Sequence, residues 1–267
     1  MNNSLNEILR NRVKEKLARD EVVASMMVRL VRGVEIVRIA KTAGFDTFYV
    51  DMEHCSFSLE ATGQICLAAL EAGIPAFVRV PANTPEYIAR VLDGGAMGVI
   101  APHVRSADDA RAVVRVARFA PQGERSANSG LPHLQYRSFP TEEANLALNR
   151  ATMVIVMMEA VQALERVEEI AAVDGVDMML VGVNDLTAEW GVPGQYDDPR
   201  VEVAFERTIA ACRAQGKHVG IGGLGSRPDL VEKFVGMGAR FVSTGTDLGF
   251  LTAACTAKAA AVASLRT

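Results

Sequence analysis

The sequence predicts one α/β domain, residues 1–267, folded as a (β/α)8 barrel of the TIM type. One unit recurs about eight times along the chain: a helical segment, a stop rich in small residues, then a short apolar strand. The apolar runs are nearly continuous, which is typical of parallel strands buried on both faces. Eight such units in about 250 residues match the size of this barrel. An open, doubly wound parallel sheet is the alternative.

The predicted strands are short runs that end where polar residues begin. In chain order they are Val22–Leu30, Thr47–Met52, Pro75–Val80, Gly98–Val104, Met153–Glu159, Val176–Gly182, His218–Gly223 and Phe241–Gly245.

The segments between these strands carry signals for the beginnings and ends of helices. A glycine just past a helix adopts the left-handed conformation at little cost, and Gly44, Gly73 and Gly238 occupy such positions. Hydroxyl side chains that accept the first free N–H groups of a helix are predicted at Ser58, Thr84, Ser106 and Ser226.

Two segments interrupt the repeat. Residues 1–19 resemble an amphipathic helix placed before the first strand, where it could close the barrel floor. Residues 121–150 form an insertion between the fourth and fifth strands and include a polar helix. No linker rich in Pro, Gly or Ser separates two domains, so one domain is expected.

Composition restricts the class of function. The chain has a net charge of −4, so it lacks the basic footprint of a nucleic-acid-binding protein. The amino terminus is not a targeting signal, and the Ala-rich tail, residues 253–265, is too short to span a bilayer. The four cysteines are far apart and form no C-x-x-C pair. These features predict a cytoplasmic enzyme or binding protein with no nucleic-acid or membrane partner.

Charged residues follow several of the predicted strands at their carboxyl ends. Active sites of (β/α)8 barrels lie at that end, so these side chains should share one rim. They are Asp51, Glu53 and His54 after the second strand, Arg79 after the third, His103 after the fourth, Glu159 after the fifth, and Asn184 and Asp185 after the sixth.

Glu159 and Asp185 form the predicted metal site. They are one β-α-β unit apart, so they should lie on neighbouring strands. Two carboxylates suit a hard divalent cation such as Mg²⁺ or Mn²⁺, which keeps open positions for substrate oxygens. The alternative is that each acid caps a helix or pairs with an arginine.

Arg79 and His54 are the predicted catalytic side chains. Arg79 offers a planar cationic fork suited to an oxyanion or carboxylate, although it could instead pair with Asp51 or Glu53. His54 can exchange protons near neutral pH, and an adjacent carboxylate would orient it. His103, His133 and His218 are interpreted as structural residues.

The order of these segments resembles the HpcH/HpaI aldolase/citrate lyase family, whose metal-dependent members cleave and form 4-hydroxy-2-oxo acids and 2-keto-3-deoxy acids. The matching segments run in family order: Phe48–His54, Val78–Val80, Val91–Ala96, Arg118–Gly123, Val156–Glu159, Ile170–Asp177 and Gly182–Leu186.

This resemblance implies a role for each matching residue. Glu159 and Asp185 would hold Mg²⁺ or Mn²⁺, with Co²⁺ also possible, and Asn184, Asp185 and Arg79 would contact substrate. His54 would be the base, with Asp93 increasing its basicity, and Arg79 would stabilise charge on the keto oxygen. The substrates would be a 2-oxo acid and an aldehyde. Members are commonly homo-hexamers that exchange the last helix, so a homo-oligomer with an exchanged C-terminal helix is expected.

The sequence departs from the family pattern at Met157, where a glutamine that contacts substrate is usual. Replacing an amide by a thioether removes a hydrogen-bond donor from the substrate site. Two further functions therefore stay open: a lyase acting on a CoA thioester, as in citrate-lyase-type relatives, and a 2-oxo-acid-binding protein with altered catalysis.

Overall fold

A closed barrel of eight parallel strands forms the centre of the protein, as predicted, in the order β1 to β8. The structure is a computed structural model and describes residues 5–265. The strands are β1 (Val23–Val28), β2 (Thr47–Asp51), β3 (Ala76–Arg79), β4 (Gly98–Ala101), β5 (Met153–Met158), β6 (Met178–Gly182), β7 (His218–Gly222) and β8 (Phe241–Thr246). All eight predicted strands are confirmed, most of them a residue or more shorter than predicted.

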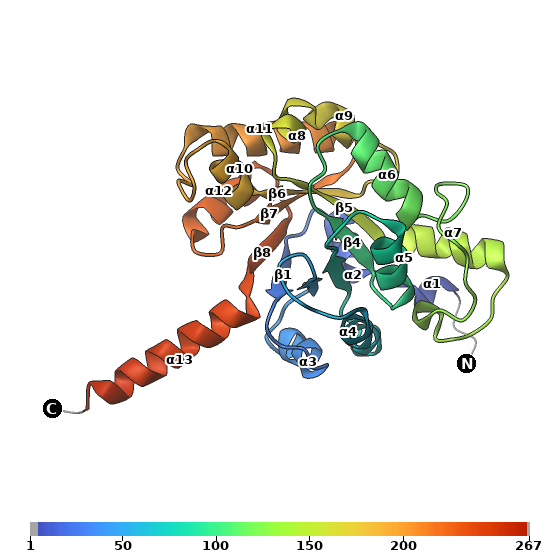
Figure 1. Ribbon diagram of the computed structural model, residues 1–267, viewed down its shortest axis with the longest axis horizontal. Coiled ribbons are helices and arrows are strands. Elements are labelled where there is room, and N and C mark those ends of the chain that lie inside the picture. The colour runs from blue at the N-terminus through green and yellow to red at the C-terminus, as the bar shows by residue number, and fades with distance from the viewer. Residues whose placement is uncertain (1–4, 266–267) are drawn as a thin grey trace.

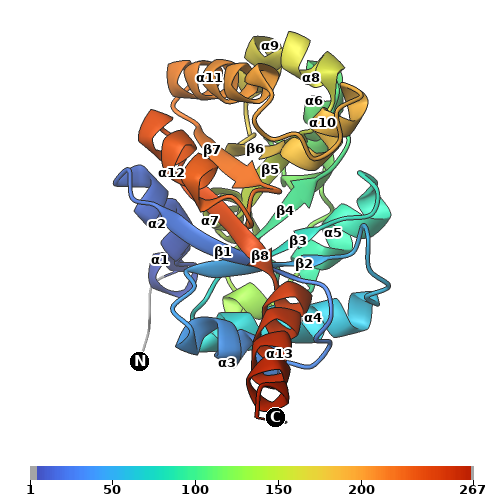
Figure 2. The same ribbon diagram turned by 90° about the vertical axis from the view of Figure 1, so that its left-hand side faces the viewer.

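Helices surround the barrel (Figures 1 and 2). They are α3 (Glu35–Thr42), α4 (Leu59–Ala72), α5 (Pro85–Asp93), α6 (Ala107–Ala117), α8 (Val161–Glu165), α9 (Val167–Ala171), α10 (Val183–Glu189), α11 (Pro199–Ala214) and α12 (Pro228–Met237). Ser58 and Ser106 cap α4 and α6 as predicted, each accepting a backbone N–H. Thr84 is the N-cap residue of α5 as predicted, although its side chain makes no cap bond. The predicted cap at Ser226 is wrong, because Arg227 is the residue that precedes α12.

The amino-terminal segment closes the floor of the barrel. Within the described part of predicted helix 1–19, two short helices form, α1 (Leu5–Ile8) and α2 (Arg12–Ala18). Leu9, Val13 and Leu17 join the same apolar cluster as the barrel interior, which includes Phe77 and Met178. The insertion holds a 3-10 turn (Pro132–Leu134) and α7 (Thr141–Ala151), which also pack on this cluster.

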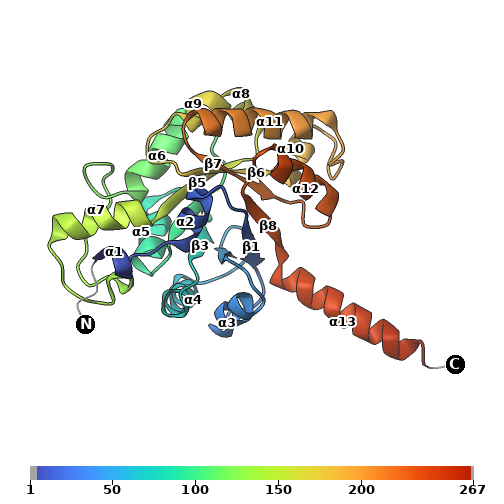
Figure 3. The same ribbon diagram turned by 180° about the vertical axis from the view of Figure 1, so that it is seen from behind.

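The last helix, α13 (Asp247–Ala263), leaves the barrel and points away from it (Figures 1 and 3). Asp247 at its first position is its only buried residue. Leu251 and Val262 expose about half of their surface, 52% and 57%. A helix with apolar residues and no covered face is unusual in a monomer, because such residues are normally buried. Among the helices of residues 5–265, none has the length and apolar character needed to cross a membrane.

Candidate active site

Strand alternation brings three charged side chains into the mouth of the barrel. Tyr49, Phe77 and Met157 belong to the interior cluster of β2, β3 and β5. Because side chains alternate between the faces of a strand, the residue two positions further along also faces inward. Those residues are Asp51, Arg79 and Glu159, all 6% exposed or less.

Arg79 is held by two carboxylates. Asp51 and Arg79 are paired residues in the register of β2 and β3. Arg79 Nε and Nη2 donate to the two Asp51 oxygens at 2.9 and 2.8 Å, and Nη1 lies 3.0 Å from Glu53 Oε2. Burial by itself would raise the pKa of Asp51, but the bonds from Arg79 more than offset it, so this pKa is lowered. Both carboxylate pairings considered from the sequence are therefore present.

Met157 lies behind this pair. Its sulfur is 3.9 Å from Arg79 Nη1, and a thioether is only a weak acceptor. Thus Met157 leaves Nη1 more available to a substrate oxygen than an amide acceptor would.

Glu159 is a buried carboxylate with one strong partner. Its Oε1 accepts the backbone N–H of His103 at 2.7 Å. Burial raises the pKa of Glu159; the His103 bond opposes this, and the nearby charges of Asp185 and Glu53 add to it. A methyl group on Gly182 would lie 2.9 Å from Glu159 Cβ, so glycine is needed there to leave space for this side chain.

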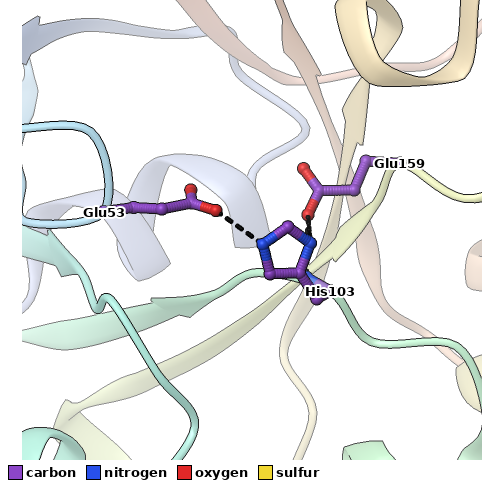
Figure 4. A group of neighbouring side chains, drawn as sticks. All are labelled: Glu53, His103 and Glu159. Atoms are coloured by element: carbon purple, nitrogen blue, oxygen red, sulfur yellow. Dashed lines mark hydrogen bonds and ion pairs between the residues drawn. The ribbon is translucent and has the colours of Figure 1, made fainter. Parts of the chain in front are cut away.

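His103 bridges the two glutamates, as Figure 4 shows. Its Nε2 is 2.8 Å from Glu53 Oε1 and its Nδ1 is 3.3 Å from Glu159 Oε1. Ligand atoms of Glu53, His103 and Glu159 all lie within 4.8 Å of one another, so these residues could hold a metal ion. His103, which was interpreted from the sequence as structural, is therefore also a candidate metal ligand. The sequence did not reveal it, because a backbone φ of +57° at His103 turns the ring into the site.

Asp185 and Asn184 stand beside Glu159 in the first turn of α10. Both are exposed. Asp185 is close enough for its charge to act on Glu159, although it is not part of the Glu53, His103 and Glu159 group. Asn184 Oδ1 accepts the hydroxyl of Tyr196 at 2.7 Å.

His54 lies at the same rim and is half exposed. Its backbone N–H donates to Asp51 at 3.3 Å, and its Nε2 is 3.6 Å from Glu53 Oε2. The structure therefore places the predicted base next to the carboxylate that also contacts Arg79 and His103.

Asp93 does not join this group within the chain. It is the last residue of α5, at the end of the barrel opposite to His54, and it pairs with Arg125 Nη2 at 2.5 Å. The expectation that Asp93 increases the basicity of His54 is therefore not met within one chain. The reason is topological: a helix that follows a strand returns to the floor, so its carboxyl end lies away from the active rim.

The donor set fits a divalent cation. Glu53 and Asp185 are both close enough for their charges to act on the buried carboxylate of Glu159, and burial together with this repulsion raises the pKa of Glu159. A cation would relieve this repulsion. Carboxylates suit Mg²⁺ and Mn²⁺, whereas the His103 nitrogen favours Mn²⁺ or Co²⁺ over Mg²⁺.

Comparison with known proteins agrees with this geometry. Residues 25–254 match the family described as HpcH/HpaI aldolase/citrate lyase. The chain is 38% identical to the 4-hydroxy-4-methyl-2-oxoglutarate aldolase tasA of Hapsidospora irregularis, over 96% of each chain. It is 32% identical to the 2-keto-3-deoxy-L-rhamnonate aldolase of Escherichia coli O1:K1 / APEC, over 91% of this chain and 90% of that one. Among solved structures it is similar to an HpcH/HpaI aldolase from Desulfitobacterium hafniense DCB-2, with 30% identity, a TM-score of 0.85, and 95% and 96% of the two chains covered.

Proposed function

Since this chain belongs to the HpcH/HpaI aldolase/citrate lyase family, we propose that the rim group around Glu159 and Arg79 is its active site. The protein is a class II pyruvate aldolase, a carbon–carbon lyase of 4-hydroxy-2-oxo acids or 2-keto-3-deoxy acids. The observation that carries the site assignment is the buried Glu159 carboxylate, which is close to Asp185 and His103. Arg79 lies at the end of β3 on the same rim, paired with Asp51 of β2.

Glu159 would hold a divalent cation, joined by Asp185 or by His103 and Glu53. When bound, the cation would act as a Lewis acid on the 2-oxo group and make the C3 protons more acidic. Arg79, fixed by Asp51 and Glu53, would place an N–H on the oxygen that becomes negative.

His54 would move the protons. In cleavage, Nε2 of His54 takes the proton of the C4 hydroxyl, the C4 carbonyl forms, and the C3–C4 bond breaks with its electron pair left on the pyruvate enolate. The same imidazolium then returns the proton to C3, which releases pyruvate. Glu53, 3.6 Å from Nε2, would stabilise the imidazolium once Nε2 has taken the proton.

Proton exchange at the methyl group of pyruvate tests this proposal without knowledge of the acceptor. In D₂O, with mass-spectrometric detection, we expect deuterium to enter pyruvate when Mg²⁺ or Mn²⁺ is present. Chelator should abolish exchange, and added cation should restore it. Exchange that persists in chelator would contradict the metal assignment, and no exchange under any condition would contradict the proposed reaction.

We further propose that α13 packs on another subunit, and that the protein is a homo-oligomer. Beside the base of α13 lies a cavity of about 460 Å³, lined largely by apolar residues of β1, α3, the loop after α3, and α13; they include Ile39, Phe45 and Phe250. An apolar cavity next to an uncovered apolar helix is expected where two chains meet.

Leu251→Glu should therefore dissociate the oligomer, because a charge would be buried at the interface. Light scattering coupled to size-exclusion chromatography should give the unchanged protein a molar mass several times the 28.6 kDa of one chain. The variant should give a smaller molar mass. Lys258→Glu changes the charge of the same exposed helix at a polar position and serves as the matched control. A monomeric unchanged protein would overturn this proposal.

A further inference from the structure

Asp247 is a buried carboxylate outside the rim group, and the reaction described above gives it no role. It is the first residue of α13 and is 6% exposed. β8 bulges just before this point, because the register of its pairing with β1 shifts between Ser25 and Met27. A bulge redirects the side chains that follow it, and Met27 is paired with Thr246, the residue before Asp247. The bulge therefore brings Asp247 to the end of β1.

The carboxylate of Asp247 collects three consecutive backbone N–H groups from the loop after β1. It accepts those of Arg29, Leu30 and Val31 at 2.8, 3.0 and 2.8 Å. Successive N–H groups that converge in this way form a binding site for an anion. Here the anion is a side chain of the protein itself. Asp247 thus fixes residues 29–33, which we call the anchored loop, against the base of α13.

The anchored loop holds the segment that follows β2. This segment, residues 51–57, is called the rim segment below. Arg29 Nε lies 3.4 Å from Asp51 Oδ2. Arg32 Nη1 and Nη2 donate to the carbonyl and the hydroxyl of Ser56 at 2.6 and 3.1 Å. Two arginines of one loop therefore hold the rim segment near both of its ends.

The rim segment carries the proposed base, His54. Arg79 is part of β3 and Glu159 directly follows β5, so the ladders of the barrel hold these two residues. His54 belongs to no helix or strand. Its backbone N–H donates to Asp51 at 3.3 Å, and the position of its ring depends on contacts made to the rim segment.

We propose that Asp247 is a positioning residue for the active site. Through the anchored loop it holds Arg29 and Arg32 against the rim segment, which keeps His54 in place beside Arg79. Asp247 contacts none of the reacting atoms, so its effect passes entirely through these contacts. The inference rests on the proposed function for the catalytic role of His54.

Replacing Asp247 with asparagine tests the effect on catalysis. The amide keeps the shape of the carboxylate, but its NH₂ group cannot accept an N–H, so part of the anchor is lost. For deuterium entry into pyruvate with Mn²⁺, kcat should fall by about 10- to 100-fold, and KM should change by less than ~3-fold. The base is displaced, whereas Arg79 and Glu159 remain to bind the substrate.

Amide hydrogen exchange, followed by mass spectrometry without substrate or cation, tests the contacts separately from catalysis. Asp247→Asn should speed exchange by about 10-fold in the anchored loop and also in the rim segment, the factor expected for one net hydrogen bond. Arg32→Gln, a change at an exposed position, removes only the second link. In that variant exchange should rise in the rim segment alone, and kcat should fall by a smaller factor.

Thr246→Val is the matched control at the same helix start. It removes the bond that Thr246 Oγ1 accepts from the N–H of Gly249 at 2.9 Å, and this bond does not involve the anchored loop. We expect kcat and the exchange of both segments to stay as in the unchanged protein.

The rim segment decides the outcome. Unchanged exchange there in both Asp247→Asn and Arg32→Gln would overturn the proposal. An equal rise in Thr246→Val would do the same, because loosening of α13 would then explain the effect. A loss in KM rather than kcat would show that substrate binding, and not the base, depends on Asp247. If exchange rises as expected but the unchanged protein puts no deuterium into pyruvate under any condition, the contacts stand and the proposed reaction fails.

Discussion

Replacing Arg79 with methionine should lower kcat for pyruvate release by about 10²- to 10³-fold, because the donor aimed at the developing enolate oxygen is lost. The same change should reduce the free energy of unfolding by ~3–5 kcal/mol, the usual cost of leaving buried carboxylates without their cation. Asp51 is fully buried and Glu53 nearly so, and both face Arg79. Steady-state kinetics and urea unfolding measure the two effects.

A second variant separates the catalytic from the structural effect of Arg79. Adding Asp51→Asn to Arg79→Met removes one of the two buried carboxylates that have lost their cation, so part of the stability should return while kcat stays low. Arg90→Met, an exposed arginine on α5, should change neither quantity by much. Full recovery of kcat in the double variant would contradict a direct role for Arg79 at the substrate.

The sequence predicts the residues of the rim where strand alternation places them. Asp51, Arg79 and Glu159 each end an apolar run at an inward position, so a pattern of period two is sufficient to bring them together. The register of β2 and β3 then sets Asp51 opposite Arg79, as the predicted adjacent strands imply.

Strand alternation does not predict the positions of three other residues, each for a different physical reason. His103 depends on a left-handed backbone at a non-glycine residue, which local propensity argues against. Arg29 falls inside the predicted strand Val22–Leu30, whereas β1 ends at Val28. Asp93 matches a family segment by sequence, but only the return of α5 to the floor reveals its distance from His54 within one chain.

Replacing Glu159 with glutamine should abolish the stabilisation of the protein by divalent cation. At a cation concentration of 100 times Kd, a bound ion stabilises a protein by about 2.7 kcal/mol, or ~5–10 °C in Tm for a chain of this size. Glu159→Gln should show no such rise, and kcat should fall by about 10³-fold or more. Without cation its Tm should equal or exceed that of the unchanged protein, because the amide removes a buried charge and can still accept the N–H of His103. Glu165→Gln, an exposed change on α8, is the control.

The rise in Tm on addition of cation also decides which residues bind the cation together with Glu159. If the site is Glu159 with Asp185, then Asp185→Asn should eliminate the rise in Tm, and His103→Ala should leave most of it. If the site is Glu53, His103 and Glu159, the two variants should exchange roles, and Co²⁺ or Mn²⁺ should stabilise more than Mg²⁺ because an imidazole nitrogen is a ligand. A rise in Tm that survives in Glu159→Gln would place the cation away from this rim and contradict both arrangements. The two sets share only Glu159, so its variant tests whether a cation binds here, and the other two variants test how.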